Sequence, residues 1–558
     1  MKRGLAAALA FSFAALALAE PARAALPKPD QDDGAIKLPP GFRALVVADD
    51  LGPLRFMTVA ANGDIYVKMR TVGIIALRDQ DGDGRAETRA AFGEGGGTGI
   101  ALRDGWLYHS TTTAVYRYKL PPGQLVPKGD PELVVSGLPD ERQHNSKSFA
   151  FDEAGLLYVE VGSPSNSFGN PDRAQGAKGG DPTEFLKTHG GFWRFDPNKL
   201  GQKQADGYHF STGHRHILAV ARNHVSKSFF IVMMGRDQLN TVAPAYYTDD
   251  DNAEAPAEEM HVLREGGSFG WPFTYFDPRK MARMVAPEYG GDNQKRAEPG
   301  KYPDPLVAFP AHWAPLQMAF YEGSQFPARY RGGAFIAFHG SWNRAPKPQK
   351  GYNVAFVPFD DKGMPRGGYE VFADGFSGRQ EFVATNEARF RPCGLAVGPD
   401  GSLYVADSEK GRIWRIIYTG ETPEPPGSSA TAGAVAPAAP AAAAAAATPA
   451  GQGPGAKVYS DLCAKCHMPD GSGVPYMQPA LTGSAVLSGD PTTLVRLLLY
   501  GADAVLPANR PKFENPMPPL AALGDDQIAD VLNYARQMFG KTAGKVTAKD
   551  VAAQRAKP

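Results

Sequence analysis

The sequence of 558 residues lacks three things: an excess of charge of either sign, a long apolar run beyond its N-terminus, and more than three cysteines. Lys and Arg together number 59, as do Asp and Glu, so the formal net charge is zero and the pI is about 7.2. Such a balance does not suggest a protein that binds nucleic acid. Without a second long apolar run we expect no transmembrane anchor. At this length the chain exceeds one ordinary domain.

The one long apolar run is at the N-terminus. It extends from Leu5 to Ala19, follows Lys2 and Arg3, and precedes the small-residue segment 22–24. Basic, apolar and small-residue segments in that order are typical of a secretory signal peptide, whereas a membrane anchor would need a longer run. We therefore expect residues 1–24 to be a cleaved signal peptide and the mature protein to be periplasmic.

Two of the three cysteines lie in one short motif, Cys463-Ala464-Lys465-Cys466-His467. The pattern C-x-x-C-H is the attachment site of a c-type haem, in which each thiol bonds a vinyl group and the adjacent imidazole binds the iron. A zinc site would need a second pair of ligands, and a thioredoxin-like site would not need His467. The third cysteine, Cys393, has no partner and is expected to be a small buried apolar residue.

The surroundings of this motif resemble small cytochromes c over about residues 456–540. Residues 456–462 are expected to be a short helix that precedes the motif, and residues 525–536 a helix with apolar residues at helical spacing and Asp525 as its N-cap. The resemblance implies that Met517, in the Pro-rich segment 516–519, is the sixth ligand of the iron. Met477 is a second choice, and Met468 is too near His467 to reach across the ring. We assign a cytochrome c domain to 456–541 and a C-terminal tail to 542–558.

A second unit lies further toward the N-terminus. Gly (63 residues) and Pro (49 residues) are frequent, which favours short strands and turns. Six segments repeat a turn followed by an apolar-aromatic strand, and these are 62–67, 104–108, 153–159, 228–232, 331–337 and 400–406. Repeats of this kind predict an all-β six-bladed β-propeller over 37–420, rather than a β-sandwich. The Ala- and Pro-rich segment 421–455 is expected to be a linker to the helical cytochrome c domain.

Polar motifs in the propeller resemble those of the quinoprotein sugar dehydrogenases. They are Gln143-His144-Asn145-Ser146-Lys147-Ser148, Gly213-His214-Arg215-His216, Glu258-Glu259-Met260, 266–272, Ala314-Pro315, Phe320-Tyr321, 339–344 and 389–392. The set is most similar to the sorbosone dehydrogenase branch of the soluble glucose dehydrogenases that depend on pyrroloquinoline quinone (PQQ). It covers most of residues 40–418.

This resemblance implies an enzyme that oxidises an aldose or a related hydroxy-aldehyde by hydride transfer to PQQ. His144 would be the general base, since an imidazole titrates near working pH. The PQQ carboxylates would be bound by basic and pocket side chains, and those candidates are Lys147, Arg215, His216, Arg344, Arg389 and Arg391. The carbonyl groups of Gly235 and Arg236 would bind Ca²⁺. Electrons would pass to the protein's own haem and then to an external acceptor, such as a soluble cytochrome or a terminal oxidase.

Two departures from this pattern bear on specificity. His216 occupies a position where the soluble enzymes usually have Asn, and no pocket Gln is recognisable around residues 95–99, so their glucose specificity is not carried over. The segment from Asp79 to Asp83 resembles the start of a calcium loop, but Ala90 stands where an EF-hand has Glu, which favours a simple turn. Two alternatives stay open: a calcium-dependent lactonase, which would have little use for a haem, and a non-catalytic propeller that docks the cytochrome.

The haem prediction can be tested directly. Replacing both thiols (Cys463→Ala with Cys466→Ala) should abolish covalent attachment, because no thioether bond can form. The measurement is a c-type spectrum after acid-acetone extraction, and haem that stays covalently bound in this variant would contradict the motif.

The sixth ligand can be tested separately. Met517→Ala should lower the haem reduction potential, while the same change at Met477 should have little effect.

Overall fold

The computed structural model describes residues 26–420, 453–473, 478–510, 513, 517, 519–542 and 545–556. The signal peptide (1–24), nearly all of the linker (421–452) and the alternative ligand Met477 lie outside these ranges. Within them, no helix is both long enough and apolar enough to cross a bilayer.

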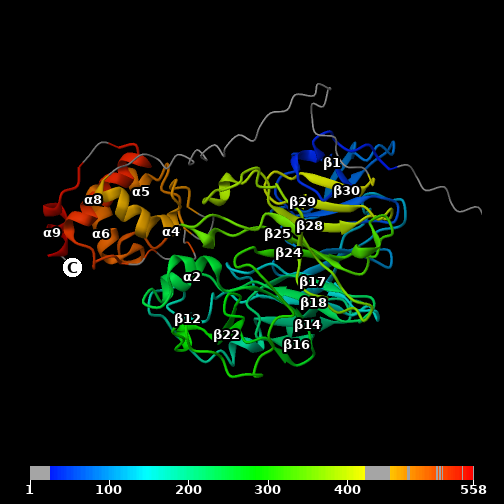
Figure 1. Ribbon diagram of the computed structural model, residues 1–558, viewed down its shortest axis with the longest axis horizontal. Helices are drawn as coiled ribbons and strands as arrows, with labels where there is room; N and C mark the ends of the chain where they lie inside the picture. The colour runs from blue at the N-terminus through cyan, green and yellow to red at the C-terminus, as the bar shows by residue number, and fades with distance from the viewer. Residues whose placement is uncertain are drawn as a thin grey trace, which may run out of the picture.

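Six sheets form the larger unit, each with four antiparallel strands, and two of them add a short parallel strand at the outer edge (Figure 1). The first two blades are β2 (Leu54–Val59), β3 (Ile65–Met69), β4 (Ile74–Arg78) and β5 (Thr88–Phe92), and then β6 (Ile100–Arg103), β7 (Trp106–Ser110), β8 (Val115–Lys119) and β9 (Glu132–Ser136). The third and fourth are β10 (Phe149–Phe151), β11 (Leu157–Val161), β14 (Gly191–Phe195) and β16 (Tyr208–Thr212), and then β17 (Ile217–Arg222), β18 (Phe229–Met233), β19 (Glu258–Val262) and β23 (Val307–Phe309). The fifth and sixth are β24 (Pro315–Phe320), β25 (Ala334–Phe338), β26 (Asn353–Val357) and β27 (Glu370–Ala373), and then β28 (Pro392–Val397), β29 (Leu403–Asp407), β30 (Ile413–Tyr418) and β1 (Phe42–Ala48).

The predicted six-bladed propeller is confirmed. Each of the six sequence repeats contains the turn that leads into the second strand of a blade, or that strand itself: β3, β7, β11, β18, β25 and β29. The first strands of neighbouring blades lie against one another, β2 beside β28 and β6, and β17 beside β10 and β24. The first strand of each blade therefore lies nearest the central axis.

The ring is closed by pairing between the two ends of the propeller sequence. Strand β1 pairs antiparallel with β30, with Phe42 opposite Tyr418, so the first strand in the chain completes the last blade. The blades pack through apolar faces, and Cys393 in β28 is fully buried between them, as expected for a small apolar residue.

The second unit is helical, and its main elements are α3 (Pro454–Val458), α4 (Ala464–His467), α5 (Ala485–Ser488), α6 (Pro491–Tyr500), α7 (Ala502–Val505), α8 (Asp525–Met538) and α9 (Ala548–Arg555). The turn from Tyr459 to Cys463 is a π-helix that joins α3 to α4. Helices α3 and α8 cross so closely that a Cβ atom on Gly455 would lie 2.1 Å from the carbonyl oxygen of Asp530. Only glycine allows this approach.

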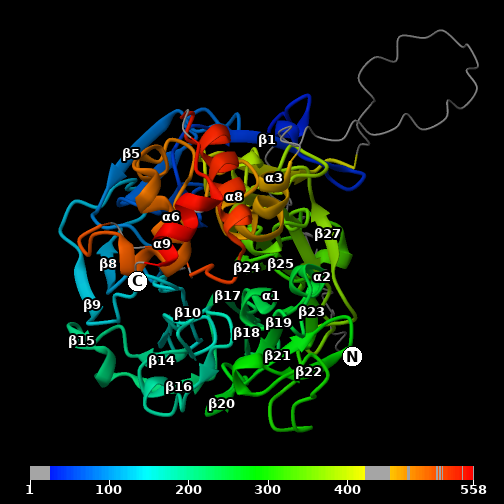
Figure 2. The same cartoon turned by 90° about the vertical axis from the view of Figure 1, so that its left-hand side faces the viewer.

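Two expectations for the helical unit need correction. Gly524, not Asp525, is the N-cap of α8, and its amide donates to Gln527 at 3.0 Å. Asp525 instead pairs with Arg555 of α9 at 2.6 Å. The segment 542–558, expected as a tail, contains α9, which packs on α6 and α8 and buries Val551 completely. The helical unit lies against one face of the propeller (Figures 1 and 2).

Candidate functional site

Propeller geometry brings most of the predicted site residues to one face. Because adjacent strands are antiparallel, the start of each first strand and the end of each second strand lie on the same side of the ring. Residues 143–147 precede β10, Arg215 and His216 precede β17, and Arg391 precedes β28, while Gly235 and Arg236 follow β18. Segments from three blades therefore meet around one mouth.

His144 is held there in a defined orientation. Its Nδ1 atom bonds the carbonyl oxygen of Ser163, and its ring stacks on that of His216 with centroids 4.8 Å apart. Because a carbonyl only accepts, Nδ1 carries the proton and Nε2 keeps its lone pair. Burial, followed by the charge of Arg215, holds the pKa of His144 well below its usual value. The imidazole is neutral at working pH and can accept a proton.

A buried carboxylate, that of Glu160, orients the imidazole of His216. Oε1 of Glu160, which is inaccessible to solvent, lies 3.1 Å from Nδ1 of His216 and accepts the amide of Ile217 at 3.0 Å. Lys147 is also buried and donates to the carbonyl oxygen of Asn145 at 2.7 Å. Burial lowers the pKa of Lys147 to about 8, although Glu160 opposes that shift.

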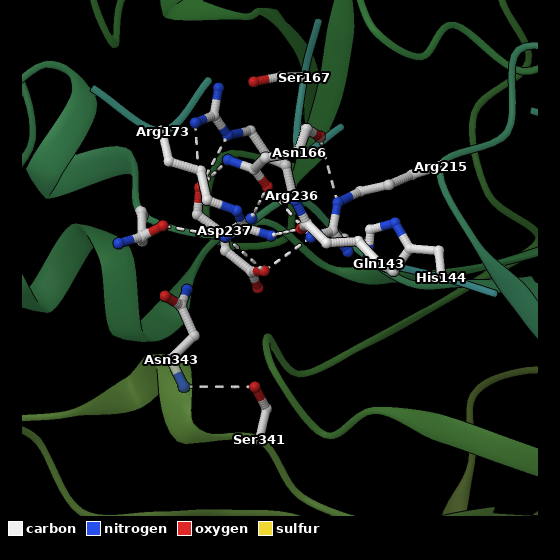
Figure 3. A network of polar contacts seen from close by, with 12 residues as sticks. Gln143, His144, Asn166, Ser167, Arg173, Arg215, Arg236, Asp237, Ser341 and Asn343 are labelled. Carbon is white, nitrogen blue, oxygen red and sulfur yellow. Dashed lines mark hydrogen bonds and ion pairs between the residues drawn. The ribbon is translucent and has the colours of Figure 1, made fainter. Parts of the chain in front are cut away.

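Asp237 is the centre of the polar network in Figure 3. Its Oδ2 atom accepts from Arg215 at 2.6 Å and from Arg173 at 3.1 Å. Asn166 bonds both the amide and the carbonyl group of Asp237, at 2.8 and 2.9 Å. Burial alone would raise the pKa of Asp237, but the two guanidinium groups hold it at about 2. Arg173 continues the network to Gln143, beside His144, at 2.7 Å.

The predicted calcium ligands have free acceptor capacity. No hydrogen bond reaches the carbonyl oxygens of Gly235 and Arg236 from any residue in the described ranges. Two unbonded carbonyl oxygens on consecutive residues fit a hard cation that prefers oxygen ligands. The nearby carboxylate of Glu258 accepts the amides of Gly235 and Ala314, each at 2.8 Å. This fixes the loop that carries both carbonyl groups.

The three arginines predicted to bind PQQ, apart from Arg215, differ in position and in hydrogen-bond partners. Arg391 lies at the mouth and donates to the carbonyl oxygens of His339 and Gly340, at 3.1 and 2.8 Å. Arg389 is exposed, and its guanidinium lies over the ring of Phe390. Arg389 therefore does not share a face with Arg391. Arg344 is buried, but Pro348, Ala253 and Glu254 accept from all three of its nitrogen atoms. We therefore do not retain Arg389 and Arg344 as candidates for PQQ binding.

Sequence reasoning missed two other arginines. Arg55, near the start of β2, and Arg70, just after β3, have side chains with no hydrogen bond or ion pair among the described residues. Burial, and then the charge of Arg70, lower the pKa of Arg55 to about 10. Burial, and then the charges of Arg391, Arg55 and Arg70, hold the pKa of His339 well below its usual value. An arginine within the apolar strand Leu54-Arg55-Phe56 was the available signal, because an inner strand faces the axis.

The haem motif lines a cavity of about 610 Å³ in the helical unit. Cys463, His467 and Met517 are on its wall, together with apolar residues of α6 and α8. The Nδ1 atom of His467 donates to the carbonyl oxygen of Pro479 at 2.9 Å, which leaves Nε2 for the iron. A covalently attached haem fits this donor set, since Cys463 is one of its two attachment thiols, His467 is the proximal imidazole and Met517 is the predicted sixth ligand.

The loop that begins at Asp79 brings four carboxylates together. Those of Asp79, Asp81, Asp83 and Glu87 have oxygen atoms within 4.8 Å of one another. The same carboxylates also accept backbone amides of their own turn, as Asp79 does from Gly82 and Gly84. A turn stabilised in this way accounts for the arrangement.

Together, a propeller with an electropositive mouth and a haem cavity define a class of protein: a propeller fused to a c-type cytochrome. The family described as TrAA12-like matches residues 36–419, and cytochrome c matches residues 453–539. The chain thus belongs to the TrAA12-like family and carries a C-terminal cytochrome c domain, as the resemblances implied.

Individual relatives agree with this division. The cytochrome c subunit of a quinone alcohol dehydrogenase from Gluconobacter oxydans is 41% identical over 105 residues, 18% of this chain and 22% of that protein. The PQQ-dependent pyranose dehydrogenase of Coprinopsis cinerea is 27% identical over 195 residues, 30% of this chain and 26% of that protein. The solved PQQ domain of that enzyme shares the propeller fold, with a TM-score of 0.56 and 19% identity over 68% of this chain and 97% of its own. The chain spans 39% or less of the first curated relatives it matches, and 87% of the small cytochrome c-552 of Thermus thermophilus.

The buried lysine generates a prediction about stability. The pKa of Lys147 falls from 10.5 to about 8 on folding. Between pH 8 and 10.5 the folded protein therefore binds fewer protons at this side chain than the unfolded protein does. Its contribution therefore makes the apo protein more stable as pH rises from 8 to 10.5. Lys147→Met should reduce this pH dependence but not abolish it, because burial also lowers the pKa of Lys68 to about 8, whereas Lys199→Met, at an exposed lysine, should retain it in full. Thermal unfolding of the propeller between pH 7 and 10.5 measures the difference. Equal slopes in wild type and Lys147→Met would contradict the prediction.

Proposed function

We propose that this protein is an exported quinohaemoprotein that oxidises an aldose or a related hydroxy-aldehyde and transfers the electrons to its own haem. The observation that carries the proposal is the pairing of a neutral, oriented imidazole with unbonded cationic side chains in one propeller mouth, on a chain that also has a haem cavity. The names of its relatives, a PQQ-dependent pyranose dehydrogenase and a cytochrome subunit of a quinone dehydrogenase, support it.

His144 is the proposed base. Nδ1 is committed to Ser163, so Nε2 is the atom that accepts the proton of the substrate hydroxyl group. The stacked ring of His216, with its Nδ1 held by Glu160, stabilises this orientation. His216 and His339 are the other imidazoles that could take the proton, and of these only His216 stacks on His144.

The cofactor-binding side chains are those with donors to spare. Arg55 and Arg70 have no described partner, and Arg391 and Lys147 each donate only to backbone carbonyl groups within hydrogen-bond distance. Guanidinium groups pair with carboxylates in a planar, bidentate way, which suits a tricarboxylate. PQQ would supply an ortho-quinone as the hydride acceptor, and the carbonyl groups of Gly235 and Arg236 would hold a Ca²⁺ ion that would polarise the quinone. Arg215 acts by positioning Asp237 and the Gly235–Arg236 loop.

The haem gives this reaction a one-electron outlet. Oxidation of one hydroxyl group releases two electrons and two protons, so the iron is reduced and reoxidised twice for each substrate molecule. An external one-electron acceptor, a soluble cytochrome or a terminal oxidase, takes these electrons in the periplasm, where residues 1–24 direct the chain. A lactone hydrolase would leave the haem cavity without a role in its reaction.

The proposal predicts the effect of removing the base. His144→Ala should retain PQQ but lose substrate-driven dye reduction by about two to four orders of magnitude, the usual span for general acid–base catalysis. The assay follows reduction of a small artificial dye by protein loaded with PQQ and Ca²⁺, over a panel of aldoses and hydroxy-aldehydes. His224→Ala, at an exposed histidine, is the matched control. If His144→Ala turns over normally while His216→Ala does not, the second imidazole is the base. If the wild-type protein oxidises none of these substrates, the proposed function is wrong.

A further inference from the structure

The two units meet through an apolar cluster that neither forms alone. We call it the docking seam, and its members are Trp342, Ala345, Val383 and Ala384 of the propeller and Met468 of the haem domain. Ala345, Ala384 and Met468 are almost fully buried, while Trp342 and Val383 are half-buried. Met468 follows the proximal ligand His467 directly in the chain. The seam therefore begins one residue from the predicted iron ligand.

The backbone of Met468 has an unusual conformation and is held by a hydrogen bond. Its φ of 63° is in the left-handed region, which costs a residue with a side chain about 1 kcal/mol. The hydroxyl group of Tyr459, a residue of the haem cavity wall, donates to the carbonyl oxygen of Met468 at 2.7 Å. Met468 belongs to the seam and not to the apolar core of the helical unit. The turn after the haem motif is thus shaped to direct this side chain toward the propeller.

Two further contacts extend the seam on either side. Asn386 donates to the carboxylate of Asp470 at 3.4 Å, just beyond Met468. Arg142, two residues before His144, lies on the wall of the haem cavity. The loop that carries the proposed base therefore also borders the haem.

The seam also joins the polar network of the propeller mouth. Trp342 is followed by Asn343, whose side-chain amide lies 3.3 Å from Nε2 of His312. Nδ1 of His312 is 4.0 Å from Oδ1 of Asp237. Figure 3 shows Asn343 and Ser341 beside the Asp237 network. A continuous series of contacts connects Asp237, His312, Asn343, Trp342 and Met468 to the proximal ligand.

We propose that the docking seam is the surface through which the haem domain receives electrons from the propeller. This inference rests on the proposed function. Each transfer moves one electron across the seam and reduces Fe³⁺ to Fe²⁺. Two transfers accept the two electrons of one substrate molecule, its two protons leave to solvent, and an external one-electron acceptor reoxidises the iron after each.

The test uses the full-length holoprotein and a charge placed in the seam. Val383→Glu should slow substrate-driven haem reduction at least tenfold, because docking would bury an unpaired carboxylate against Met468. Val371→Glu, at a valine that is 44% exposed in the outer strand β27 of the same blade, should not slow it. Stopped-flow absorbance of the haem after mixing with substrate gives the rate, and small-dye reduction should be unchanged in both variants. Haem reduction at the wild-type rate in Val383→Glu would overturn the proposal.

A pair of exposed residues gives a second variant that does not endanger the fold. Asn386→Asp would set two carboxylates against each other and should slow haem reduction a few-fold at low salt, with the effect screened at high salt. Adding Asp470→Asn to the same chain should restore the rate. A double variant as slow as Asn386→Asp would overturn the assignment of this contact to the seam.

Hydrogen–deuterium exchange supplies a readout that does not depend on activity. In the oxidised protein without substrate, peptides covering 382–388 and 466–472 should exchange faster in Val383→Glu than in wild type or Val371→Glu. Unchanged exchange in both peptides would overturn the seam as the docking surface. The outcomes separate the two proposals: a wild-type protein that reduces no dye refutes the proposed function, whereas normal dye and haem reduction in Val383→Glu refutes only the seam.

Discussion

The pairing of β1 with β30 is the constraint on which the rest of the propeller depends. The site residues come from segments as far apart in the chain as Arg55 and Arg391, and they converge because the inner strands surround one axis. Without ring closure, the last blade would expose an unpaired edge and the first strands would not hold a common mouth. The pairing that closes the ring therefore also fixes the geometry of the site.

Within that mouth, buried charge is arranged in two ways. Around Asp237 it is compensated, since Arg215 and Arg173 pair with the carboxylate and keep it ionised, while Asn166 holds the backbone of Asp237. Around Arg55 and Lys147 it is not, and burial lowers the pKa of both side chains. A compensated network fixes positions, whereas uncompensated cations favour an anionic ligand. In the proposed function, the first network holds the site residues in position and the second binds the anionic cofactor.

The covalent join between the units changes the physical problem of electron transfer. Two separate proteins would have to collide and orient, whereas tethered units meet at a high effective concentration and need only a weak, well-shaped contact. A small apolar seam with one polar contact at its edge is of that kind.

Local sequence determined the elements whose signals are local. The C-x-x-C-H motif, the six turn-and-strand repeats and the Ala- and Pro-rich linker are each readable within a few tens of residues, and they predicted both domains. Tertiary structure decided what depends on direction and distance. Arg344 and Arg389 carry the same charge as Arg391, yet one is consumed by acceptors at the end of a helix and the other points outward. Arg55 and the seam at Met468 have no motif. A lone arginine in a strand, or a methionine after a haem ligand, acquires a role only from residues far away in the chain that folding brings beside it.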